Sequence, residues 1–201
     1  SFTQNGTFDL TGKTVTFDGG GDGSGTADDS TITCSGTLGG TVVLSKTIIY
    51  GTITIASGCS INLGASPTST IVATSGLTNN GTITIASGTW TIGGAGTVTN
   101  AGTIIHNGAS PGWDFNNVSF TNSSGATVTY TGSSLTIERN FTQNGTFDLS
   151  AVTVTLDGAD NADDATLVCG AALGSLTVNK THATGNTTLG SSCTIAGAFT
   201  R

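Results

Sequence analysis

The chain has 201 residues, of which 31 are glycine and 8% are charged, and its formal net charge is -7. This charge content lies far below the roughly 25% typical of soluble globular domains. The five basic residues form no cluster, so the electrostatic basis for binding nucleic acid is missing. No apolar stretch approaches the roughly 20 residues that span a bilayer. Frequent Thr, Val and Ile favour strands over disorder, which predicts an all-β fold.

Internal repeats organise the chain from its first residues onward. Residues 2–63 resemble residues 141–197, and plainer repeats fill residues 66–140 between these two units. We therefore expect one continuous domain over residues 1–201.

A short theme recurs within these units: an apolar residue, Thr, one or two amide or small polar residues, and Gly. It starts at Phe2, Leu77, Val98, Phe120 and Phe141. The last four starts are 21, 22 and 21 residues apart, so the period is close to 21 residues. We expect the apolar residues of the theme to share one interior column and the amides to form a corner or exterior ladder.

Each period contains three strand-like runs separated by glycine. Between Gly81 and Asn100 the runs are Thr82–Ile85, Thr89–Ile92 and Thr97–Asn100, and each alternates polar and apolar residues. Three short strands per coil of roughly 21 residues predict a single parallel β-helix, or β-solenoid. Hairpin-like Asn-Gly pairs recur at one coil length, so we interpret them as solenoid corners.

The end of the chain, Ala198-Phe-Thr-Arg201, resembles its start, Ser1-Phe-Thr-Gln4. This predicts that both segments occupy the same position in a coil, and that the solenoid stacks head to tail on another copy or continues in a longer protein. No polar capping element is evident, although open solenoid ends normally need one.

The four cysteines form two matching pairs, Cys34 with Cys59 and Cys169 with Cys193, separated by 25 and 24 residues. Adjacent coils lie about 4.8 Å apart, which a disulfide can bridge. Disulfides would indicate an oxidising, extracellular setting. The alternative is four buried free thiols.

Acidic residues concentrate in two equivalent glycine- and alanine-rich loops. These loops hold Asp18, Asp22, Asp28, Asp29, Asp157, Asp160, Asp163 and Asp164. Such carboxylates are candidate ligands for Ca²⁺, the one cofactor that the sequence suggests. A solvated turn that keeps a charge-poor surface soluble is the simpler interpretation.

No catalytic cluster is evident, and we expect no enzyme activity. Asp114 and Glu138 are isolated, and His106 and His182 have no nearby acid or nucleophile, so both histidines are expected at the surface. Trp113, in a Gly-Ala-Ser-Pro-Gly loop, is a candidate exposed contact.

Trp90 is expected in the interior, where it replaces a smaller residue of the corresponding Cys59 segment.

Thr-x-Thr segments such as Thr82–Thr84 would form an ice-binding face, as in β-solenoid antifreeze proteins, if they stacked without interruption. The equivalent segments Thr103–Ile105 and Thr146–Asp148 break that pattern. Threonine is therefore interpreted as an ordinary solvent-facing strand residue.

Eight asparagines match the N-glycosylation pattern N-x-[ST], several of them at expected corners. They are Asn5, Asn80, Asn117, Asn122, Asn140, Asn144, Asn179 and Asn186. A chain rich in Asn, Ser and Thr also produces such matches by chance.

The glycine-punctuated coils, such as Gly51-Thr-Ile-Thr and Phe2-Thr-Gln-Asn-Gly-Thr-Phe, resemble the right-handed β-helix repeats of large microbial surface proteins, similar to filamentous-hemagglutinin and autotransporter adhesins. The resemblance covers nearly the whole chain, although paired cysteines are unusual in such adhesins. It implies an elongated extracellular stalk, adhesin or fibre. We expect a structural subunit or segment of an extracellular filament or giant cell-surface protein, with copies that stack head to tail or bundle laterally through their charge-poor sides. The alternative is an adhesin module that binds glycans or a partner cell through the loops near residues 19–29, 107–117 and 157–164.

Overall fold

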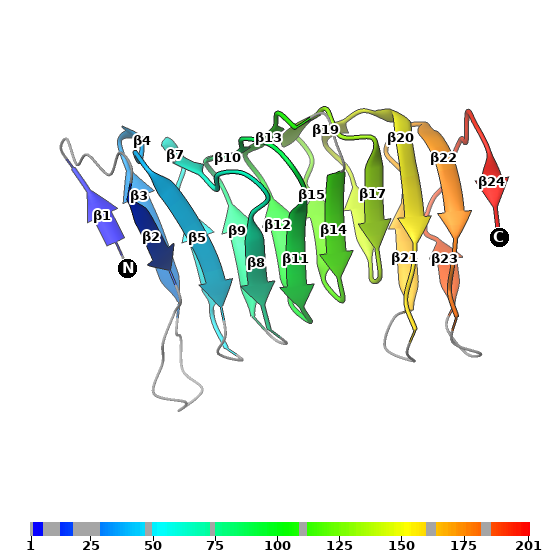
Figure 1. Ribbon diagram of the computed structural model, residues 1–201, viewed down its shortest axis with the longest axis horizontal. Helices are drawn as coiled ribbons and strands as arrows, with labels where there is room; N and C mark the ends of the chain where they lie inside the picture. Colours follow the sequence, from blue (N-terminus) through cyan, green and yellow to red (C-terminus); the bar gives the residue numbers. More distant parts are fainter. Residues whose placement is uncertain are drawn as a thin grey trace.

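Alternating polar and apolar residues wind three parallel sheets around one apolar core. The computed structural model describes residues 2–5, 13–17, 29–46, 50–72, 75–108, 112–159, 164–181 and 186–201. Within these ranges every named strand is paired in parallel, and no helix is long and apolar enough to cross a membrane. The strands succeed one another along the long axis from the first to the last part of the chain (Figure 1). This confirms the predicted all-β solenoid, with roughly 22 residues per turn.

Sheet I begins each coil and has nine strands. They are β1 (Phe2–Gln4), β3 (Ser30–Cys34), β6 (Thr52–Ile55), β9 (Gly76–Asn79), β12 (Thr97–Asn100), β15 (Ser119–Asn122), β18 (Phe141–Gln143), β21 (Ala165–Val168) and β23 (Thr187–Leu189).

Sheet II follows sheet I within a coil and has six strands. They are β4 (Gly36–Thr37), β7 (Cys59–Asn62), β10 (Thr82–Ile85), β13 (Thr103–His106), β16 (Thr127–Tyr130) and β19 (Thr146–Phe147).

Sheet III completes each coil and again has nine strands. They are β2 (Thr14–Phe17), β5 (Thr41–Lys46), β8 (Thr68–Ile71), β11 (Trp90–Gly94), β14 (Gly112–Asn116), β17 (Ser134–Ile137), β20 (Leu149–Leu156), β22 (Leu173–Val178) and β24 (Phe199–Thr200).

Inward-pointing residues of sheet I form two columns along the solenoid. The first column contains Ile53, Leu77, Val98, Phe120, Phe141, Leu167 and Leu189. The predicted interior column is therefore confirmed for every member except Phe2. Phe2 pairs with Ile32, and Ile32 pairs with Ile55, which places Phe2 in the second column. That column continues from Ile55 to Asn79.

The two Phe-Thr segments near the ends of the chain do not share a position in the coil. Phe2 lies in β1 of sheet I, whereas Phe199 lies in β24 of sheet III and pairs with Leu176. The expectation of equal phase is therefore wrong. A shared Phe-Thr pair does not determine the position of a segment in the coil, because such a pair can occur in a strand of any of the three sheets.

Candidate functional site

Both predicted cysteine pairs are disulfides that join neighbouring coils. The Cα atoms of Cys34 and Cys59 lie 4.7 Å apart, and those of Cys169 and Cys193 lie 5.3 Å apart. No described cysteine is free. Cys34 ends β3 and Cys59 begins β7, so the first bond links sheet I of one coil to sheet II of the next. Both of its cysteines are buried, whereas Cys169 and Cys193 are half-buried.

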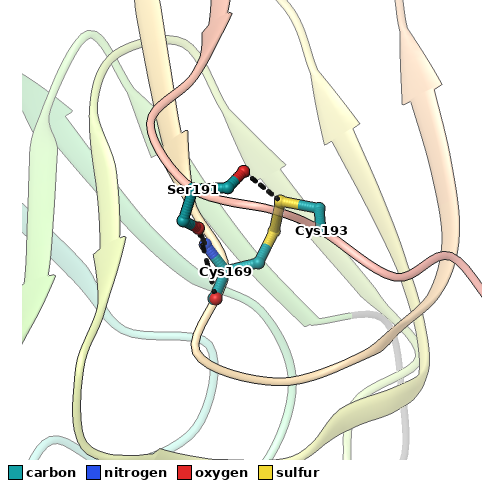
Figure 2. The surroundings of a disulfide bond; sticks show 3 residues. All are labelled: Cys169, Ser191 and Cys193. Atoms are coloured by element: carbon teal, nitrogen blue, oxygen red, sulfur yellow. Dashed lines mark hydrogen bonds between the residues drawn. A yellow bond between two sulfur atoms is a disulfide. The ribbon is translucent and has the colours of Figure 1, made fainter.

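The second disulfide has a serine beside it that extends the link between coils. The backbone N–H of Cys169 donates to Ser191 Oγ at 2.9 Å, and Ser191 Oγ donates to the Cys169 carbonyl at 3.3 Å (Figure 2). Covalent and hydrogen-bonded contacts thus fix the same turn. The two bonds fit an oxidising compartment.

The described members of the acidic loops act as hydrogen-bond acceptors for the next coil. Asp29 Oδ1 accepts from the backbone N–H of Thr52 at 2.7 Å, and the equivalent Asp164 Oδ1 accepts from that of Asn186 at 2.6 Å. Each bond positions the chain where a strand of sheet I begins. Asp157 Oδ1 accepts instead from Asn179 Nδ2 at 3.2 Å.

These contacts give the carboxylates a structural role that the sequence analysis did not anticipate. Among the described residues, no group of three or more His, Cys, Asp or Glu side chains is arranged to hold a metal ion. The other candidate calcium ligands, which lie outside the described residues, are Asp18, Asp22, Asp28, Asp160 and Asp163. Calcium binding through them stays a prediction.

A column of amides runs inside the solenoid, where the sequence had suggested a corner or exterior ladder. Asn79, Asn100, Asn122 and Gln143 end four successive strands of sheet I, and all four are buried. Asn79 Nδ2 donates to Asn100 Oδ1 at 2.8 Å, and Asn100 Nδ2 donates to Asn122 Oδ1 at 2.8 Å. Buried amides are stable because such partners replace water.

The side-chain amides also donate to the backbone of sheet II. The Nδ2 groups of Asn79, Asn100 and Asn122 donate, in that order, to the carbonyl oxygens of Thr103, Thr127 and Thr146 at 2.9, 3.3 and 3.2 Å. Each of these threonines begins a strand one coil further along. The amide column therefore ties sheet I to sheet II as well as coil to coil.

His106 and Trp113 lie in the core, so the expectation that they are exposed is wrong. Their side chains are 0% and 1% exposed. His106 Nε2 donates to the carbonyl of Gly88 at 2.7 Å, and its ring stacks on Tyr130 with centroids 5.0 Å apart. Trp113 packs edge-on against Trp90, which is buried as predicted, at 5.4 Å.

Strand alternation explains both corrections. His106 is the last residue of β13, and Trp113 is the second residue of β14. Each side chain lies on the inward side of its strand. Glycine and proline before Trp113 suggested a loop, but the strand begins at Gly112. His182 lies outside the described residues.

The candidate glycosylation sites separate by exposure. Six are exposed: Asn5, Asn80, Asn140, Asn144, Asn179 and Asn186. Asn117 is half-buried and accepts a hydrogen bond from Arg139 Nε. Asn122 is fully buried in the amide column, so a glycan has no access to it in the folded chain. Glycosylation of the exposed positions stays a prediction.

Charged groups gather at the outer side of sheet III and the turns that follow it. Burial, and then the nearby charge of Asp157, raise the pKa of Asp114 above its usual range. Lys180 Nζ donates to the Glu138 carbonyl at 2.7 Å across two coils. The Lys180 contact links a turn to a coil two turns away, whereas the carboxylates of Asp114 and Asp157 repel each other. The absence of enzyme activity stays a prediction.

Comparison with protein-family models, curated proteins and solved structures finds no match to this chain. The function must therefore be inferred from the geometry and surface chemistry of the solenoid. The resemblance to surface adhesins, and the alternative of glycan binding through loops, stay predictions from sequence.

Proposed function

We propose that this chain is a structural subunit or segment of an extracellular filament or large cell-surface protein, in which coil stacks on coil. The observation that supports this best is the continuous parallel pairing of sheets I and III through nine strands each. Successive coils present one another with parallel strand edges and inward apolar side chains. Such a stack can be extended by adding strands of a further coil to the edges of the existing sheets.

The coil formed by β23 and β24 carries apolar side chains at positions where a further coil would pack. Leu189 continues the first inner column of sheet I and is 53% exposed, and Phe199 at the edge of sheet III is 60% exposed. A further coil placed on β23 and β24 would bury both side chains and pair their backbone groups. Burial of each side chain would contribute about 1.5–3 kcal/mol.

Location outside the cell is supported by the two inter-coil disulfides. Disulfides persist in oxidising compartments. Only 8% of the residues of the chain are charged, so rods that pack side by side would bring few ionic groups together.

The stacking surface can be tested with the double variant Leu189→Lys/Phe199→Lys. Two charges at this surface should prevent strand addition, so light scattering coupled to size-exclusion chromatography should show single chains where the wild type forms longer assemblies. Tyr50→Lys is the matched control, because Tyr50 is 40% exposed but lies in the turn before β6. Assembly of the double variant to the same mass as the wild type would exclude this surface.

A further inference from the structure

The outer face of sheet I carries a column of threonines from β3 to β18, which ends where Thr142 pairs with Val168 of β21. In register, one per coil, they are Thr31, Thr54, Thr78, Thr99, Thr121 and Thr142. Four of them are the Thr of the repeated theme, between an inward apolar residue and an inward amide. The Thr-x-Thr segments considered from sequence lie mostly in sheet II, so this column was missed.

A second outward column lies beside the first and contains Thr52, Gly76, Thr97 and Ser119. Neighbouring coils lie about 4.8 Å apart and alternate residues of a strand about 6.6 Å apart. The two columns therefore place hydroxyl groups, with methyl groups at the threonines, on a two-dimensional lattice that has a gap at Gly76. At Gly76, where a side chain is missing, there is a depression of about 340 Å³ lined by Thr52, Thr78, Thr97 and Thr99 among others.

The interior holds this lattice in a fixed position. Residues between the threonines pack inward, and the rings of Phe120 and Phe141 stack with centroids 5.5 Å apart directly beneath the face. The amide column fixes the spacing of β9, β12 and β15 from the same side. A rigid array loses little conformational entropy when it binds a rigid partner.

The chemistry of the face limits what it can bind. From β6 to β18, the described outward residues of sheet I include neither a charged nor an aromatic side chain. Ionic ligands therefore lack a counter-charge, and sugars lack an aromatic ring on which to stack. The remaining ligand class is one that matches an uncharged, regular pattern of hydroxyl and methyl groups.

We propose that the outer face of sheet I binds ice. Threonine hydroxyls can take lattice positions of water at the ice surface, while the methyl groups beside them exclude liquid water. Each contact is weak, and the affinity comes from many contacts made at once by one rigid surface. This inference is independent of end-to-end stacking, which leaves the face uncovered, whereas lateral bundling would have to use another side of the rod.

The other two faces are less regular. The main outward column of sheet III is interrupted by the carboxylate of Asp114, between Thr91 and Thr136. In sheet II the column of Thr82 and Thr103 is continuous, but the column beside it changes from Asn62 to Thr84, Ile105 and Thr129.

The test compares the wild type with Thr99→Lys and Thr121→Lys, which place a long charged side chain in the sheet I column. The wild type should partition into a slowly growing ice front and show thermal hysteresis above that of serum albumin. Both variants should lose these properties while their melting temperatures stay close to that of the wild type. Two variants in different coils guard against the failure of one to fold.

Thr103→Lys is the matched control, because it changes the equivalent sheet II column in the same coil as Thr99. It should retain ice binding. The proposal is overturned if the wild type binds no ice, if Thr103→Lys loses binding as Thr99→Lys does, or if the wild type is retained on crystalline cellulose without entering ice.

Discussion

Single buried amides fix the spacing of neighbouring coils more specifically than apolar side chains can. Asn100 is the centre of the column, since it accepts a hydrogen bond from Asn79 and donates to Asn122 and to the Thr127 carbonyl. A buried polar group that loses its partner costs about 1–3 kcal/mol. The loss of one amide therefore affects three coils.

Asn100→Ala should lower the free energy of unfolding by about 2 kcal/mol or more, because Asn122 Oδ1 and the Thr127 carbonyl lose a donor. Urea denaturation measures this change. The control is Asn80→Ala, an exposed amide next to the column, which should change stability by less than about 0.5 kcal/mol. Equal effects of the two substitutions would show that the column contributes nothing.

Asp114 should make the folded chain sensitive to pH. Burial and the charge of Asp157 raise the pKa of this carboxyl from its ordinary value of 3.8, so ionisation opposes folding at neutral pH. The loss of stability caused by ionised Asp114 is complete above the pKa of the folded state and disappears below the ordinary pKa of the unfolded state. Asp114→Asn should therefore raise the melting temperature at pH 7 and leave it nearly unchanged at pH 3.

The pKa of Asp148 is shifted in the opposite direction to that of Asp114. Hydrogen bonds from the Ser150 hydroxyl and backbone N–H lower the pKa of Asp148, so its ionised form stabilises the fold above the ordinary pKa and this contribution is lost as the pH falls. Asp148→Asn should lower the melting temperature at pH 7. A shift of the same sign for both variants would contradict the assigned environments.

Each disulfide joins consecutive coils and closes a loop of similar length, so each should contribute about 3 kcal/mol by restricting the unfolded chain. Their accessibility differs, because Cys34 and Cys59 are buried and Cys169 and Cys193 are half-buried. Under native conditions a thiol reductant should therefore open the second bond first. Alkylation at intervals, followed by peptide mass analysis, gives the order of reduction, and earlier labelling of Cys34 would contradict this prediction.

The repeated theme predicted the strands of sheet I well, since its three residue types have three different positions. The apolar residue packs inward, Thr points outward, and the amide that follows points inward again, as at Leu77, Thr78 and Asn79. The burial of the amide was not predicted, because asparagine is mostly exposed in proteins. The recurrence of the amide once per coil could have predicted its burial, because stacked amides can donate hydrogen bonds to one another inside a core.

Coil length varies along the chain. Asp29 and Thr52, which bond across coils, are 23 residues apart, whereas Asn79 and Asn100 are 21 apart. Phe2 was assigned to the first column because its segment repeats the theme at Phe141, but likeness of sequence does not show how the first strand is aligned with the next coil. Trp113 was misplaced because a Pro and several Gly residues precede a strand that buries it.

As a whole the chain is a long stack with backbone pairing directed along its axis (Figure 1). Within the described residues, the strands of all three sheets are paired with neighbouring coils, so their backbone groups are held in ladders along the axis. The disulfides lie near the two ends of this stack, in the repeated units, and the amide column lies between them. The covalent links and the amide column thus stabilise different parts of the rod.

The proposed role of this rod is assembly, and electron microscopy of the native protein with fibre diffraction tests it most directly. Filaments of uniform width should form, with a reflection at about 4.8 Å along the filament axis because the coils stack in that direction. Dispersed single rods at every protein concentration, with specific retention on glycans, would contradict the structural role and favour an adhesin.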